Sequence, residues 1–234
     1  MIDVRPRNRL GAFRNDWLDS RFHFSFADYR DPTRMGWGGL RVWNDDRIEP
    51  QTGFDMHPHR DMEIITYVRT GAITHRDNLG NHGRTEAGDV QVMSAGTGIV
   101  HAEHNLEEED TTLFQIWIFP DRDGHEPGWA TRRFPKGANA GRLVTLASGR
   151  DADRAAGALP IHADARVLGA TLRAGDTVRH RLDAGRKAYL VPAAGSVTVN
   201  GVALGTGDGA AIADEAELAI AASNDAEIVL VDVA

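Results

Sequence analysis

Short apolar runs separated by glycine-rich turns dominate the hydrophobic pattern of this chain. The runs are rich in Val, Ile, Thr, Phe and Leu, which favour β-strands, and helical periodicity is not evident over ten or more residues. The expected strands cover residues 39–44, 62–70, 71–76, 90–94, 112–119, 142–146, 187–192, 196–199 and 228–233. The pattern therefore predicts an all-β protein.

Two copies of a similar hairpin lie 124 residues apart in the sequence. Tyr67-Val68-Arg69-Thr70-Gly71 aligns with Val191-Pro192-Ala193-Ala194-Gly195, and a Gly-Asp turn follows each copy, at Gly88-Asp89 and at Gly207-Asp208. In the second copy, Asn200-Gly201 predicts a two-residue hairpin turn of the primed type. Repetition on this scale predicts two related β-barrels or sandwiches in tandem.

A stretch of turn-forming residues separates the two copies. It includes residues 121–128 and Pro135-Lys136-Gly137, and such a composition is typical of a connection between domains. We therefore expect an N-terminal domain over residues 1–130 and a C-terminal domain over residues 131–234.

Composition and charge narrow the classes of function. The chain has 234 residues, no cysteine and a formal net charge of −8. Without cysteine there are no disulfides and no thiolate ligands, which favours a cytoplasmic location. The negative charge argues against direct binding of nucleic acid, and no segment approaches the ~20 apolar residues of a membrane span. The motifs of serine hydrolases, P-loop enzymes and dinucleotide-binding enzymes are also missing.

Two short segments carry the residues best suited to bind a metal ion. His57-Pro58-His59 and His101-Ala102-Glu103 each place two such side chains two residues apart, and on a β-strand that spacing directs both to one face. Three imidazoles and one carboxylate suit a divalent transition-metal ion, whereas calcium and magnesium prefer oxygen ligands. We expect one ion, Fe(II) in preference to Cu, Ni, Co, Mn or Zn, at His57, His59, His101 and Glu103.

Glu63 is the alternative to Glu103 as the carboxylate ligand, because residues 57, 59, 61 and 63 share strand parity. Glu103 is favoured, since it lies one strand repeat from His101, and Glu63 would then orient an imidazole N–H from outside the ligand set. Parity directs His104 away from the face of His101, which favours a non-ligand role. Other histidines lack a partner at ligand spacing and are interpreted as structural or exposed: His75, His82, His125, His162 and His180.

The second copy of the repeat lacks the candidate ligands. In the 124-residue alignment, Arg181, Asp183 and Lys187 stand opposite His57, His59 and Glu63. No sequence after Gly207 resembles His101-Ala102-Glu103. We therefore expect a single metal site, in the first domain.

Several longer motifs complete the pattern: Trp17-Leu18-Asp19-Ser20, Phe24-Ser25-Phe26-Ala27, Leu40-Arg41-Val42-Trp43-Asn44-Asp45-Asp46, His57-Pro58-His59-Arg60-Asp61-Met62-Glu63, Met93-Ser94-Ala95-Gly96-Thr97-Gly98-Ile99, His101-Ala102-Glu103 and Gln115-Ile116-Trp117-Ile118. Together with the histidine segments they resemble the pirin family, and more narrowly the bacterial pirin-like quercetin dioxygenases. The resemblance spans nearly the whole chain and is weaker in the second domain.

This resemblance implies a bicupin, in which two tandem cupin barrels each form a double-stranded β-helix, or jelly roll. It implies a metal ion in the N-terminal cupin, held at the positions of His57, His59, His101 and Glu103, and a C-terminal cupin without ligands. Many other cupins have their carboxylate ligand at the position of Glu63, whereas the pirin family has it at the position of Glu103.

The implied activity is oxidative opening of the central ring of a flavonol such as quercetin, with O2 as co-substrate and release of carbon monoxide. Glu103 is the candidate both to anchor the metal and to accept the proton of the flavonol hydroxyl. Phe54, Met56, Met93 and Phe114 are candidate apolar walls of the pocket, and packing in the core explains each of them at least as well. Two alternatives are a metal-dependent regulatory module with a protein partner, as animal pirins resemble transcriptional cofactors, and a cupin isomerase or hydrolase.

Overall fold

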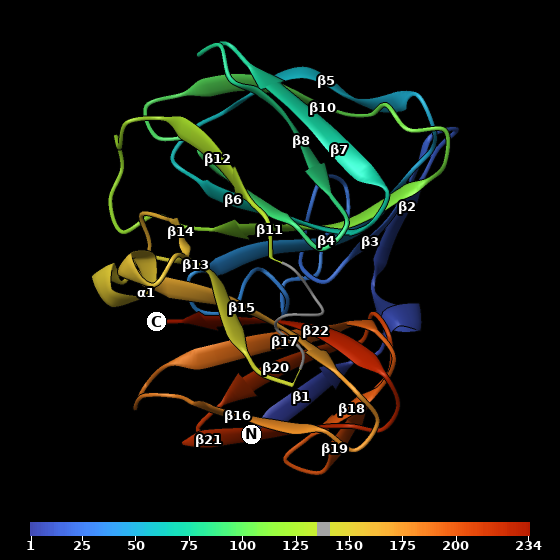
Figure 1. The fold of residues 1–234 in the computed structure, drawn as a ribbon, viewed down its shortest axis with the longest axis vertical. Coiled ribbons are helices and arrows are strands. Elements are labelled where there is room, and N and C mark those ends of the chain that lie inside the picture. The colour runs from blue at the N-terminus through green and yellow to red at the C-terminus, as the bar shows by residue number, and fades with distance from the viewer. Residues whose placement is uncertain (135–140) are drawn as a thin grey trace.

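The computed structural model describes residues 1–134 and 141–234 as four β-sheets stacked in layers (Figure 1). Among these residues, helix is limited to a 3-10 turn, η1 (Arg7–Arg9), and a short helix, α1 (Asp151–Ala155). No helix in this part of the chain is long and apolar enough to cross a membrane. The prediction of an all-β fold is confirmed.

The first domain consists of two antiparallel sheets that share a core. Its seven-stranded sheet has the order β12 (Gly128–Arg132), β9 (Val90–Ser94), β6 (Glu63–Thr70), β11 (Thr111–Ile118), β4 (Leu40–Ile48), β3 (Leu18–Phe22) and β2 (Gly11–Arg14). Its four-stranded sheet has the order β5 (Thr52–His59), β10 (Ile99–Asn105), β7 (Ala72–Asp77) and β8 (His82–Glu86), and forms the outer layer.

The second domain repeats this arrangement, except for one parallel pair of strands at an edge of its larger sheet. Its seven-stranded sheet has the order β1 (Ile2–Arg5), β20 (Gly209–Ala213), β17 (Lys187–Ala194), β22 (Ala226–Val233), β15 (Ala165–Leu172), β13 (Val144–Ser148) and β14 (Leu159–Pro160). Its four-stranded sheet has the order β16 (Thr177–Arg181), β21 (Glu217–Ala222), β18 (Val197–Val199) and β19 (Val202–Leu204). Strand β1 comes from the start of the chain, so the first residues belong structurally to this second sheet.

The two seven-stranded sheets pack against each other and are buried on both faces. On β6, Ile65 and Tyr67 belong to the core cluster shared with the second domain, whereas Ile64 and Val68 face the interior of the first barrel. Burial on both sides explains the nearly continuous apolar runs that predicted these strands. Alternate residues of each inner strand therefore face either the neighbouring domain or the interior of their own barrel.

The 124-residue repeat is visible in the structure. Strand β6 (Glu63–Thr70) and strand β17 (Lys187–Ala194) begin and end at equivalent positions, and each is followed by a glycine with positive φ, Gly71 at 73° and Gly195 at 70°. Asn200 and Gly201 also have positive φ, which confirms the primed hairpin turn. The domain boundary after residue 130 stays a prediction: β12 spans it, and the loop predicted at Pro135-Lys136-Gly137 lies outside the described residues.

One strand is longer than the sequence indicated. The strand predicted over residues 39–44 continues to Ile48, through two aspartates that are typical of turns. Asp45 accepts hydrogen bonds from Arg69 and Arg7 on the face toward the second domain, and Asp46 accepts one from Ser20. These partners allow both carboxylates to stay buried within a central strand.

Candidate metal centre

Strands β5 and β10 carry the predicted metal ligands and lie side by side in the outer sheet of the first domain. In their register His57 is opposite His101, and Phe54 is opposite Glu103. Strand β5 therefore advances three residues while β10 advances two, which is a β-bulge. The bulge changes the alternation of faces, so that Phe54 and His57 line the same cavity.

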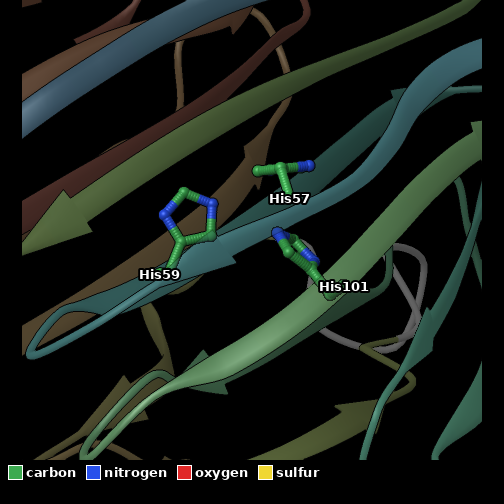
Figure 2. Close-up of side chains that lie close together, drawn as sticks. All are labelled: His57, His59 and His101. Atoms are coloured by element: carbon green, nitrogen blue, oxygen red, sulfur yellow. The ribbon is translucent and has the colours of Figure 1, made fainter.

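The rings of His57, His59 and His101 face one another (Figure 2). Their centroids are 4.5 Å apart for His57 and His101, 4.8 Å for His57 and His59, and 5.0 Å for His59 and His101. One ring nitrogen of each lies within 4.8 Å of those of the other two. The structure thus brings together three of the four predicted ligands, and their coordination of a metal ion stays a prediction.

The state of these imidazoles fits a divalent ion. Burial, with a smaller contribution from His57, lowers the pKa of His59 to about 4. Burial and the neighbouring imidazoles lower the pKa of His101 to about 2, so both rings are neutral near pH 7 and keep a lone pair for a metal. Nε2 of His101 is buried without a hydrogen-bond partner among the described residues, and an ion would give this atom a partner.

Glu103 is almost fully buried and is held by neutral donors. Its Oε1 accepts a hydrogen bond from the Gln91 amide and lies 3.4 Å from the Thr66 hydroxyl, and its Oε2 accepts from the Gln115 amide. Burial raises the pKa of Glu103 to about 7, although these three hydrogen bonds act in the opposite direction. The carboxylate is therefore fixed in place and close to the point at which it can gain or lose a proton near neutral pH.

His75, which was predicted from the sequence to be structural or exposed, is a neighbour of this centre. One of its ring nitrogens, one of His101 and a carboxylate oxygen of Glu103 lie within 4.8 Å of one another. Its Nδ1 is 3.4 Å from Nδ1 of His101, its Nε2 is 3.0 Å from Oδ2 of Asp77, and its ring stacks on Trp129. The available signal was the two-residue spacing of His75, on a predicted strand, and Asp77, which directly follows the predicted end of that strand.

Glu103, rather than Glu63, is the carboxylate next to the histidines. Glu63 begins β6 in the other sheet, where its Oε2 accepts a hydrogen bond of 2.7 Å from the Ser94 hydroxyl. It also accepts a hydrogen bond from the backbone N–H of His162. Its two partners in the structure are thus a hydroxyl and a backbone amide, rather than the imidazole of a predicted ligand. His104 contacts Asp55 instead of the histidine cluster.

A cavity of about 280 Å³ opens beside His57, His59 and Glu103. Trp117 borders it and meets His59 edge-on, with ring centroids 4.9 Å apart. The rest of the lining is mainly apolar with a few polar groups, and consists of Phe13, Leu18, Ser20, Phe22, Phe26, Ala27, Asn44, Asp46, Phe54 and Gln115. A mostly apolar cavity with a few convergent polar groups is typical of a small-molecule site.

Only one of the four predicted wall residues lines this cavity, namely Phe54. Phe114 lies on the opposite face of β11, in the core shared with the second domain, and Met93 packs in a separate cluster with Ile64. Met56 is 45% exposed. The prediction was wrong for Phe114 and Met93 because apolar character alone does not indicate which face of a doubly buried strand a residue occupies. It was wrong for Met56 because this residue is exposed on the outer strand β5.

Comparison with known proteins relates the whole chain to one family. The family model described as Pirin matches residues 3–118, and the model described as quercetinase C-terminal cupin domain matches residues 145–233. A pirin-like protein of Caulobacter vibrioides is 62% identical over the full length of both chains. Quercetin 2,3-dioxygenase of Escherichia coli is 42% identical, over 99% of this chain and 98% of the relative.

A solved structure agrees with the fold throughout. The bacterial pirin YhhW from Escherichia coli in complex with nickel(II) superposes with a TM-score of 0.92 at 42% identity, over 100% of this chain and 99% of that one. The tandem cupin architecture implied by the sequence motifs is confirmed.

Proposed function

Because this chain belongs to the pirin family and ends in a cupin domain of the quercetinase type, we propose that it is a metal-dependent dioxygenase of flavonols. In the proposed reaction, O2 oxidises a flavonol such as quercetin, the central ring opens and one carbon leaves as carbon monoxide. O2 is the only oxidant required, and no external reductant takes part. A relative of similar length that is named quercetin 2,3-dioxygenase supports this reaction class.

The observation that carries the proposal is the position of the histidine cluster beside an apolar cavity, which two of the three histidines line. His57 and His59 line that cavity together with Phe54 and Trp117, whose aromatic side chains suit flat apolar rings. The cavity volume of about 280 Å³ is close to the lower end of ligand pockets in proteins. A cavity of this volume lined by aromatic side chains favours a small-molecule substrate over the alternative role as a protein-docking module.

His57, His59, His101 and Glu103 are the residues that would hold the ion. A divalent transition-metal ion bound there would lower the pKa of a coordinated flavonol hydroxyl. Glu103 is suited to accept the proton from that hydroxyl, since its carboxylate lies next to the histidine cluster and lines the cavity. Gln91 and Gln115 hold the carboxylate through its two oxygens, which limits the reorganisation needed when the proton moves.

The walls of the cavity have a second task in this reaction, which is to exclude water. Phe22, Phe26 and Phe54 line it, and Phe26 meets Trp117 edge-on with ring centroids 5.4 Å apart. Excluding water strengthens the electrostatic interactions within the site and protects an electron-rich flavonolate from competing reactions. We propose Fe(II) as the resident ion, and elemental analysis of the purified protein tests that choice.

The decisive experiment measures O2 uptake and carbon monoxide release with quercetin, using protein as purified, protein treated with a chelator, and chelated protein reloaded with single metals. We expect both signals from the purified protein, their loss on chelation and their return on reloading with Fe(II). O2 uptake without carbon monoxide would contradict ring opening. If no metal supports turnover but a partner protein is captured only in the absence of chelator, the regulatory alternative replaces the dioxygenase.

A further inference from the structure

The floor of the cavity contains four polar residues, of which one, Gln115, donates a hydrogen bond to Glu103 and three are not used by the metal centre. Ser20 on β3, Asn44 and Asp46 on β4 and Gln115 on β11 all line the cavity. They sit side by side in the sheet, because Ser20 is paired with Asp46 and Asn44 with Gln115. Ser20, Asn44 and Asp46 are each less than 5% exposed. Three buried polar residues thus form one patch on the inner face of the seven-stranded sheet.

Two of these groups can accept hydrogen bonds from a ligand. Oδ1 of Asn44 is buried and has no hydrogen-bond partner among the described residues. Asp46 uses Oδ1 to accept a hydrogen bond from the Ser20 hydroxyl, and its second oxygen keeps acceptor capacity whether the carboxyl group is ionised or protonated. A buried acceptor without a partner is costly, and its retention in a native fold calls for an explanation.

The metal centre and this polar patch lie on different walls of the cavity. The histidines project from strands β5 and β10 of the outer sheet, whereas Asn44 and Asp46 project from β4 of the seven-stranded sheet. Aromatic side chains, among them Phe22 and Phe54, fill much of the remaining wall. A flat ligand that reaches the histidines with one edge can therefore meet acceptor groups with another part of its ring system.

We propose that Asn44 and Asp46 are specificity-determining residues, which accept hydrogen bonds from phenolic hydroxyls of the substrate that do not coordinate the metal. This inference rests on the proposed function only for the identity of the substrate as a flavonol. A phenolic O–H is a donor on a flat apolar ring, and this combination matches two acceptors set among aromatic walls. The substrate class is accordingly a polyhydroxylated flavonol, rather than any flavonol with a 3-hydroxyl.

A pocket built to bind a hydroxyl discriminates against an analogue that lacks it, because the buried acceptor is then left unpaired. From the cost of one unpaired buried group, we expect a preference on the order of 10- to 100-fold for each acceptor. Quercetin and 3-hydroxyflavone make the relevant comparison, since both carry the 3-hydroxyl and only quercetin carries hydroxyls on the outer rings.

The test measures the dissociation constants of quercetin and 3-hydroxyflavone for the metal-loaded protein by calorimetry without O2. We expect the wild type to bind quercetin at least tenfold more tightly than 3-hydroxyflavone. Asn44→Leu and Asp46→Asn should each reduce this ratio of dissociation constants about tenfold. Asn44→Asp keeps an acceptor and should retain most of the ratio. Asn8→Leu, at an exposed residue outside the cavity lining, is the matched control and keeps the wild-type ratio.

Equal binding of the two flavonols by the wild type would overturn the inference, as would Asn44→Leu and Asp46→Asn proteins with the wild-type ratio. Asp46→Asn retains an oxygen that can accept from Ser20, so it provides a second measurement if Asn44→Leu does not fold. Binding in the absence of O2 separates this inference from the proposed reaction. If the protein binds quercetin more tightly than 3-hydroxyflavone but releases no carbon monoxide, the recognition of hydroxyls is supported and the dioxygenase is contradicted. If it releases carbon monoxide but binds both flavonols equally, the dioxygenase is supported and the recognition of hydroxyls is contradicted.

Discussion

Nδ1 of His101 lies 3.4 Å from Nδ1 of His75. The second nitrogen of His75, Nε2, is 3.0 Å from a carboxylate oxygen of Asp77. Because an ionised carboxylate only accepts, Nε2 of His75 carries the proton and its Nδ1 is an acceptor. His101 then donates from Nδ1, and its Nε2 keeps a lone pair for a metal ion. The contact with His75 thus selects the tautomer of His101 that can bind metal.

Replacing His75 with phenylalanine should weaken metal binding while preserving the aromatic stack on Trp129. The expected loss of affinity is on the order of 10- to 100-fold, which is typical when a residue that orients a metal ligand is removed. Competition with a chromophoric chelator measures it. His104→Gln is the matched control, because His104 is on the same strand as His101 but contacts Asp55. Equal affinity in the His75→Phe and His104→Gln proteins would show that His75 does not position the ligand.

His57→Ala and His101→Ala should each abolish bound metal and quercetin turnover while the protein stays folded. His57 lines the cavity and His101 is buried beside it, and the hydrophobic clusters of the two domains include neither residue. The fold therefore does not depend on the ion. Elemental analysis, circular dichroism and carbon monoxide release give the three readouts. Full activity in either variant would reject the assigned site.

Glu103→Gln and Glu63→Gln distinguish the two candidate carboxylates. We expect Glu103→Gln to retain some metal and to lose at least ~100-fold in turnover, the lower range for loss of a general base. Glu63→Gln should keep most of its activity, because Glu63 bonds Ser94 and the backbone of His162 rather than a ligand histidine. Turnover measured at equal metal content makes the comparison. Damage confined to Glu63→Gln would reverse the assignment.

Gly53 allows strands β5 and β10 to approach each other closely. A methyl group at this position would lie 2.3 Å from the backbone oxygen of Glu103 and 2.5 Å from Cα of His104. Gly53→Ala should therefore push the strands apart, lower the free energy of unfolding by ~1–3 kcal/mol and weaken metal binding. Thermal unfolding and metal titration measure the two effects. Gly128→Ala is the control, since a methyl group there meets no atom within 4 Å.

The sequence predicted the inner strands and the tandem arrangement well, and the polar parts of the fold poorly. Strand β9 was predicted with its observed limits, residues 90 to 94, because its apolar run is buried on both faces. Short strands with few apolar residues, such as β2, β8 and β14, give no comparable signal. Strand β1 pairs with β20, more than 200 residues away, and such a long-range pairing is not encoded in local propensity.

In the candidate site too, the features that depend on local sequence were predicted, and those that depend on pairing between strands were not. The spacing in His57-Pro58-His59 brought two imidazoles together because strand alternation is a local property. The bulge that adds Phe54 to the same wall, and the cross-strand contact of His75 with His101, depend on register between strands. Register is set by the whole sheet, so neither followed from the spacing of residues along the chain.

His23 is a buried imidazole at the contact between the two domains. Its Nδ1 is 2.9 Å from the hydroxyl of Tyr189, and it is fully inaccessible to solvent. Burial, together with nearby positive charge, lowers its pKa to about 3. The charged groups that contribute are all arginines, namely Arg5, Arg34, Arg7 and Arg69. His23 therefore stays neutral in the folded protein under conditions in which an exposed histidine is protonated.

This difference makes stability depend on pH. Below about pH 6.5 the unfolded chain binds a proton at His23 that the folded protein does not take up until about pH 3, so the free energy of unfolding falls as the pH falls through this window. The expected contribution is about 2 kcal/mol between pH 6.5 and 4.5. Urea unfolding of the metal-free protein at both values should show a smaller loss for His23→Gln, which can still bond Tyr189 but does not titrate. Equal losses in the two proteins would mean that His23 is already protonated in the folded state.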